Sequence, residues 1–233
     1  MCAAGVISRD HLLRLSVVRG RISAESAGEG AMASVNASAE AVQRELDALG
    51  RDVHVANLNG PQQTIVAGPE NDLETAVERL AEKGFRVRRL AVTAAFHTPG
   101  MRAAACELER QLNKSTFEAP KVPVYNNTTA DLYGDDADAN RELLVRHIAE
   151  PVRFEEQIRR MYDHGARVFY EVGPGRVLSN LIGWILDGQP HSVLPLDVDG
   201  RPGWTQFAHV IAQTAALGVP SRLDSWFESR GLF

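Results

Sequence analysis

Cysteine is scarce in this sequence. Its 233 residues include two cysteines, Cys2 and Cys106, which lie far apart and belong to no CxxC pair. Without a Cys/His cluster a structural zinc site is excluded, and no metal is expected. A disulfide framework is excluded too, which is typical of proteins kept in a reducing cytoplasm. We therefore predict a cytoplasmic protein without a metal centre.

Long hydrophobic runs are also lacking. No apolar stretch approaches the ~18 residues that a membrane-spanning helix needs. The first seven residues are apolar, but Arg9 and Asp10 follow at once, which argues against a signal peptide. The sequence predicts no association with a membrane.

An excess of basic residues is missing as well. The 25 lysines and arginines are outnumbered by 30 acidic residues, so the net charge is -5. Nucleic-acid binding usually shows as a basic excess, and no such partner is expected. Hydrophobic residues make up 44% of the chain and charged residues 24%, as in soluble globular proteins. The length suits one large domain or one domain with a smaller insertion.

The clearest periodicity lies in residues 30–92. Short runs of alternating apolar residues are separated by amphipathic helical segments, with Gly50, Gly60-Pro61 and Gly84 as breaks. The order βαββαβ is the ferredoxin-like arrangement. The expected strands are 31–35, 53–58, 64–67 and 85–92, and the expected helices end at residues 49 and 83.

After residue 93, helical patterns alternate with short strand patterns. This alternation favours a parallel sheet with helices on both faces, and hence an α/β fold. We predict a large α/β unit from residues 1–29 and 93–204, an inserted unit at 30–92, and a C-terminal helix and tail at 205–233. Expected strands are 122–126, 168–172 and 193–196.

His97 is the best single candidate for chemistry. It lies in a loop after a strand pattern and before a helix, where sites collect in α/β folds. A neutral imidazole with a pKa near ~6.5 accepts protons at physiological pH. The alternative is an ordinary surface histidine beside a turn, because the chain has seven histidines.

Arg19 is the second candidate. A helix is expected from Ser8 onward, and Leu12, Leu15, Arg19 and Ile22 follow one another at three- and four-residue spacing. A guanidinium on an apolar face needs an anion, and a carboxylate held by two hydrogen bonds is the natural one. The alternative is an arginine that extends past the edge of the core or pairs with a structural acid.

The segment 171–175, Glu-Val-Gly-Pro-Gly, ends a strand pattern and opens a helix. It does not match the GxxxxGK[ST] phosphate loop, so we interpret it as a structural turn. Nearby Ser179 lacks the strand-turn-helix context of a nucleophile, and no GxSxG motif occurs anywhere in the sequence.

Six short motifs, taken in order, resemble the malonyl-CoA:acyl-carrier-protein transacylase family, the acyltransferases of fatty-acid and polyketide synthesis. The resemblance covers nearly the whole chain. It implies a partial α/β-hydrolase-like parallel sheet with an inserted ferredoxin-like subdomain. The motifs are residues 4–8 with 19–20, 57–63 with 66–68, 95–99, 122–127, 151–154 and 171–175.

The resemblance implies a ping-pong transfer through a seryl acyl-enzyme. His97 would be the base, and the backbone carbonyl of His147 would orient its ring. Arg19 would hold the malonyl carboxylate, Asn59 would border the acyl pocket, and Phe96 resembles the bulky residue of malonyl-selective members. The implied substrates are malonyl-CoA and the phosphopantetheine of an acyl carrier protein. No tightly bound cofactor is implied, and other synthase domains are implied partners.

The family's serine is the largest departure. In the family its elbow lies just before a segment like residues 2–5, so we expect this chain to begin after it and to lack a central strand. We expect the isolated chain to form no acyl-enzyme. The residues from 206 onward resemble the segment that follows the acyltransferase in synthase modules. Two alternatives stay open: a carboxylate- or carrier-binding module without catalysis, and a degenerate fragment.

Overall fold

The computed structural model describes residues 1–25, 30–222 and 224. The chain forms two compact units, Met1–Asp163 and His164–Phe233. Each combines helices with strands, so the predicted α/β class is confirmed. Helices are not long and apolar enough to cross a membrane anywhere in these described ranges.

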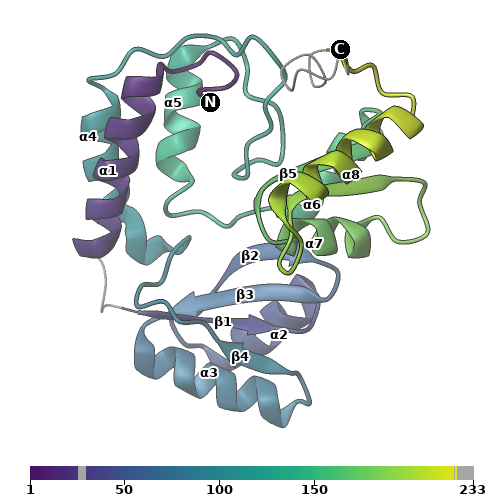
Figure 1. The fold of residues 1–233 in the computed structure, drawn as a ribbon. Coiled ribbons are helices and arrows are strands. Elements are labelled where there is room, and N and C mark those ends of the chain that lie inside the picture. The colour runs from purple at the N-terminus through teal and green to yellow at the C-terminus, as the bar shows by residue number, and fades with distance from the viewer. Residues whose placement is uncertain (26–29, 223, 225–233) are drawn as a thin grey trace. The chain divides into compact units, whose positions relative to one another are not determined.

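The first unit contains a four-stranded antiparallel sheet with two helices, as the periodicity of residues 30–92 predicts (Figure 1). The strand order β2-β3-β1-β4, with α2 after β1 and α3 after β3, is that of the ferredoxin-like fold. The elements are β1 (Ala31–Val35), α2 (Ala39–Leu49), β2 (His54–Gly60), β3 (Gln63–Gly68), α3 (Glu70–Glu82) and β4 (Val87–Arg89).

Local signals set the ends of α2. The Ser38 side chain accepts a hydrogen bond from the backbone N–H of Ala41 at 3.3 Å, and Gly50 ends the helix in the left-handed region at φ 65°. Helices α2 and α3 turn their apolar faces toward the sheet, and this buries a continuous core. Its fully buried members include Val35, Val42, Val66, Leu73 and Leu80.

The outer edge of β2 is covered by a residue from far along the chain. Leu58 donates its N–H to the carbonyl of Val152 at 2.8 Å, and Val152 donates to the carbonyl of Ala56 at 2.9 Å. This pairing ties the start of α6 (Phe154–Asp163), which contacts β2, to the sheet. It places the segment after α5 (Ala137–Arg146) beside β2.

The other helices of this unit pack against one another. α1 (Arg9–Glu25) contacts α4 (Arg102–Leu112), and α4 contacts α5 (Ala137–Arg146) (Figure 1). A 3-10 turn, Pro99–Met101, precedes α4. Their shared core includes Val6, Ile22, Leu108, Leu112 and Ile148.

The predicted strand at residues 122–126 is wrong. This segment makes a single antiparallel bridge, between Tyr125 and Leu132, and within the described part of the chain no strand pairs along it. A β-pattern yields a strand only where a neighbouring strand supplies a hydrogen-bonded ladder. Asn126 instead accepts hydrogen bonds from the N–H groups of Thr128 and Thr129, which closes a tight turn.

The second unit contains a two-stranded parallel sheet. The strands β5 (Val168–Pro174) and β6 (Ser192–Asp197) pair in parallel, with α7 (Val177–Ile185) and α8 (Gly203–Ala216) packed on them. The Glu171 carboxylate accepts the N–H groups of Leu178 and Ser179 at 3.0 and 2.8 Å, and also the Ser179 hydroxyl. These contacts fit the interpretation of this motif as a structural turn.

The predicted division into 1–29 with 93–204, 30–92 and 205–233 was drawn from motifs, and it stays a prediction. The helix α8 (Gly203–Ala216) begins two residues before the predicted tail and forms its first part. Residue 223 and residues 225–233 lie outside the described part of the chain.

Candidate active site

The His97 loop is held by the turn that follows α5. His97 donates its backbone N–H to the carbonyl of Ile148 at 3.1 Å, and its Nδ1 lies 2.7 Å from the carbonyl oxygen of His147. His97 has φ 60°, in the left-handed region. That conformation costs a residue with a Cβ roughly 1–2 kcal/mol, and such strain collects at functional sites.

The hydrogen bond to His147 fixes the tautomer of His97. A carbonyl oxygen only accepts, so Nδ1 must carry the proton, and in the neutral ring Nε2 is the acceptor. Burial lowers the pKa of His97; the charge of Arg19 lowers it further, against the opposing effect of the His147 carbonyl. The ring is therefore neutral at physiological pH and able to take a proton.

A second imidazole packs beside the first. The ring centroids of His97 and His147 are 5.0 Å apart, with planes tilted by 53°. Burial lowers the pKa of His147 to about 4, and repulsion from His97 when that ring is protonated and from the Arg19 guanidinium lowers it further. Its Nε2 is buried and has no hydrogen-bond partner within the described residues.

Arg19 lies close enough for its charge to act on both imidazoles. The prediction that it sits on the apolar face of its helix is wrong, because Arg19 is exposed. The face of α1 that packs inward is formed by Leu15, Val18 and Ile22, while Leu12 is 40% exposed. This places Arg19 at the edge of the buried face.

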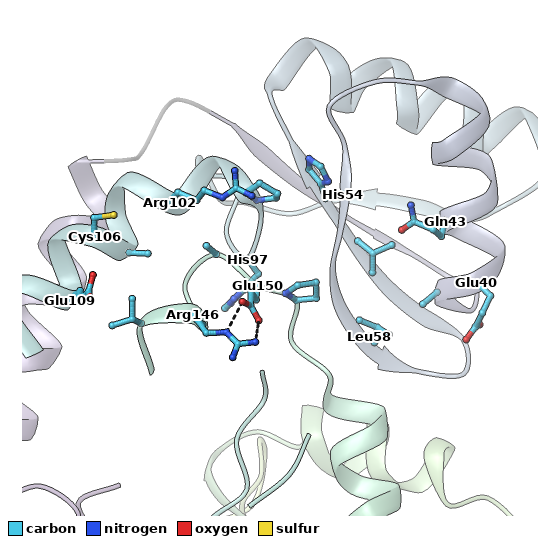
Figure 2. Close-up of a pocket in the computed structure, with 17 residues that line it drawn as sticks. Glu40, Gln43, His54, Leu58, His97, Arg102, Cys106, Glu109, Arg146 and Glu150 are labelled. Carbon is cyan, nitrogen blue, oxygen red and sulfur yellow. Dashed lines mark hydrogen bonds and ion pairs between the residues drawn. The ribbon is translucent and has the colours of Figure 1, made fainter. Parts of the chain in front are cut away.

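A cavity of about 820 Å³ opens beside His97. Figure 2 shows Arg102, Cys106 and Glu109 of α4 on one side and Glu40, Gln43, His54 and Leu58 of the ferredoxin-like unit on the other. Arg19, Asn59 and Phe96 are not among the described residues that line it. The remaining lining residues are Ala39, Val55, Pro99, Ala105, Val145, Arg146, Ala149, Glu150 and Pro151.

Two other predicted site residues have structural contacts. The Asn59 amide donates to the Gln63 side chain at 3.1 Å across the β2–β3 hairpin. Phe96 is partly buried and packs against both the helical core and the cluster on the sheet face away from α2 and α3. Their predicted roles in acyl binding stay predictions.

The wall of the cavity also includes an ion pair that was not predicted from the sequence. The Arg146 guanidinium donates two hydrogen bonds, of 2.8 and 3.1 Å, to the Glu150 carboxylate (Figure 2). The four-residue spacing of these opposite charges at a helix end was a usable signal. Arg102 also lines the cavity and makes no ion pair with any described residue.

The cavity offers little other chemistry. Among its described lining residues the sole thiol or hydroxyl is that of Cys106, and none is a serine. No cluster of three or more His, Cys, Asp or Glu side chains in the described residues could hold a metal ion. The site combines a neutral imidazole acceptor with a nearby guanidinium, which suits proton transfer next to a bound anion.

Comparison with known proteins assigns most of the chain to one family. Residues 1–213 match the family described as "Acyl transferase domain". The chain is 33% identical over 235 residues to a polyunsaturated fatty acid synthase subunit of a Thraustochytrium species, with 96% of this chain and 8% of that protein covered. It is 36% identical over 189 residues to malonyl CoA-acyl carrier protein transacylase of Bacillus subtilis, with 78% and 59% covered.

Solved structures of acyltransferases are also similar to this chain. The acyltransferase domain of the second module of the salinomycin polyketide synthase superimposes with a TM-score of 0.85 at 33% identity, covering 94% of this chain and 51% of that one. A malonyl-transacylase solved in complex with a type II polyketide synthase acyl-carrier protein gives 0.83 at 29%, covering 91% and 68%. The chain thus spans about half to two thirds of these structures.

Proposed function

Because the chain belongs to the acyl transferase domain family, we propose that it takes part in transferring a malonyl group from coenzyme A to the phosphopantetheine thiol of an acyl carrier protein. The observation that carries this proposal is the geometry of His97. Its Nδ1–H is fixed on the carbonyl of His147, so the basic Nε2 is available beside the cavity.

His97 is the general base in this proposal. Its Nε2 takes the proton of a serine hydroxyl as the oxygen attacks the thioester carbonyl, and the proton passes to the sulfur of coenzyme A as the C–S bond breaks. The carrier thiol then repeats these steps in reverse. The carbonyl of His147 accepts the Nδ1–H bond throughout and stabilises the imidazolium between the steps.

Arg19 supplies selectivity for a carboxylated acyl group. Its charge reaches both imidazoles, so a carboxylate bound to it would lie next to the reacting centre. Phe96 and Asn59 would act at the border of the acyl pocket. Phe96 packs in two cores, so its size would set the position of the loop that bears His97.

The serine of this mechanism is not in the sequence, which has no GxSxG motif. We propose that this chain alone forms no acyl-enzyme. A carboxylate- or carrier-binding role without catalysis is the alternative, and the absence of a serine among the described cavity residues favours it for the isolated chain.

The proposed partners are an acyl carrier protein and other synthase domains, in a cytoplasmic setting. Support for the first is the structural neighbour solved with its carrier protein. Support for the second is the likeness to a polyunsaturated fatty acid synthase subunit. No tightly bound cofactor is proposed; coenzyme A enters and leaves as substrate.

Calorimetric titration tests the proposal on the chain as it is. Malonyl-CoA should bind more tightly than acetyl-CoA, because only malonyl-CoA offers a carboxylate to Arg19. Arg19→Gln should remove this preference. Arg14→Gln, an exposed arginine of the same helix, should keep it. Equal affinity for the two thioesters in the unaltered chain would overturn the proposal.

Intact-mass measurement separates the transfer reaction from binding. After incubation with malonyl-CoA, the chain should keep its original mass, since no nucleophilic serine is present. A stable malonyl adduct would refute this part of the proposal and would call for a search for the acylated residue, beginning with Cys106, which lines the cavity.

A further inference from the structure

The side chain of His147 has no part in the proposed reaction, which uses only its carbonyl. Yet the ring lies 5.0 Å from the ring of His97 and is partly buried. Both the hydrogen-bonded carbonyl and the packed ring therefore come from one residue, at the end of α5. The His97 imidazole therefore has one side against the backbone carbonyl of His147 and another beside the tilted ring of the same residue.

The His147 ring stays uncharged. Its Nε2 is buried without a partner among the described residues, so a proton there would be an unsolvated donor. The pKa of about 4 agrees with this geometry. An uncharged ring can pack closely against His97 without repelling the imidazolium that forms on it during transfer.

The other charged and titratable groups around His97 come from several elements. Arg19 acts from α1. Arg146 and Glu150, at the end of α5 and just after it, neutralise each other. The others that line the cavity are Glu40, His54, Arg102, Cys106 and Glu109. The titratable ring that packs against His97 is that of His147.

We propose that His147 is a positioning residue. Its ring excludes water from one side of the His97 imidazole and helps to hold that imidazole in the orientation set by the hydrogen bond to the His147 carbonyl. This inference rests on the proposed function in one respect, that His97 is the base. The residue acts through His97 and is given no contact with substrate.

The test is an NMR titration of the His97 imidazole nitrogens in the full chain, in three variants. His147→Ala keeps the carbonyl but removes the ring, so water should reach His97. Its pKa should rise toward the ordinary value, and its Nδ1 proton should exchange faster. His147→Leu keeps an apolar side chain in place and should leave both readouts near the unaltered values. His191→Ala, in the second unit, is the control and should change neither.

Two results would overturn the inference. One is a His97 titration and Nδ1 exchange unchanged in His147→Ala. The other is an equal change in His147→Leu and His147→Ala, which would show that the ring acts by something other than excluding water. If His147→Ala does not fold, the Leu variant still decides, because an upward shift there contradicts the proposal. No acyl transfer is measured, so failure of malonyl-CoA selectivity would count against the function alone.

Discussion

Residues 31–89 and residues 93–153 lie in the same compact unit but are built differently. In the first segment four strands pair in one antiparallel sheet, and the helices α2 and α3 cover one face of it. In the second, strand pairing is reduced to isolated bridges, and His97 and Ala130 have left-handed backbone angles. Buried side-chain atoms without a hydrogen bond occur at Asn127, Arg141 and His147 in the second segment, and at Glu45 in the first.

The difference indicates that the sheet segment contributes mainly to stability, whereas the second segment carries the candidate catalytic residue. The sheet segment pairs its strands and buries an apolar core, and residues of α2 and β2 form one wall of the cavity. The second segment carries the left-handed backbone angles of His97 and Ala130 and more of the unpaired polar atoms, and strained conformations of this kind collect at functional sites. The candidate base, His97, lies in the second segment and is held there by the backbone of His147 and Ile148.

The largest effect is expected from the core of the sheet segment. Leu73 is fully buried between α3 and the sheet. Leu73→Ala leaves a cavity and should lower the free energy of unfolding by about 3–5 kcal/mol, measured by urea denaturation. Glu74→Ala, its exposed neighbour, should change it little. The His97 titration should stay unchanged in Leu73→Ala; if it moved, the two segments would not be separable as described.

The next largest effect is expected from lowering the pH, which should reduce the free energy of unfolding through His147 in the second segment. The pKa of His147 is about 4 in the folded protein, against ~6.5 in the unfolded chain. Between these values the unfolded chain binds more protons, so stability is lost as the pH falls through this window. From pH 7 to pH 4 the unaltered protein should lose up to about 3 kcal/mol more than His147→Gln, which cannot titrate.

Urea unfolding at both pH values measures this difference. Leu73→Ala serves as the matched variant, because it weakens the sheet segment but should keep the pH dependence of the unaltered protein. Identical pH dependence in the unaltered protein and in His147→Gln would contradict the assignment of a buried, neutral His147.

A smaller effect is expected at the start of α2. The Ser38 hydroxyl caps this helix by accepting the N–H of Ala41. Ser38→Ala should cost about 1 kcal/mol in the free energy of unfolding, while Ser38→Asn, another good cap, should recover most of it. Equal losses for Ala and Asn would show that the serine acts by something other than capping.

The sheet segment could be predicted from sequence because its signals are local. Gly50 and the Gly60-Pro61 turn punctuate alternating and helical patterns, and the resulting order βαββαβ leaves few arrangements. Residues 122–126 carried a similar local signal and failed, since a strand also needs a partner. The buried face of α1 was predicted wrongly. Leu15 and Ile22 can share a helix face with either Leu12 or Val18, and the prediction chose Leu12, whereas Val18 packs inward in the structure.

The candidate site was harder to predict for a physical reason. His97 and His147 are fifty positions apart in sequence, and the bond between them is made by a carbonyl, which leaves no mark on residue type. Family resemblance suggested that contact, whereas periodicity did not. The ring packing of His147 and the Arg146–Glu150 pair beside the cavity depend on how the α5 turn meets the His97 loop.

The central claim is that Arg19 and His97 serve one substrate, and a single titration tests it most directly. The His97 imidazole is followed by NMR with saturating malonyl-CoA or acetyl-CoA. The Arg19 charge lowers the pKa of His97, so a carboxylate bound to Arg19 should offset that charge and raise the pKa. We predict an upward shift with malonyl-CoA, none with acetyl-CoA, and none with either in Arg19→Gln. The same shift with both thioesters, or no shift with malonyl-CoA, would contradict the account.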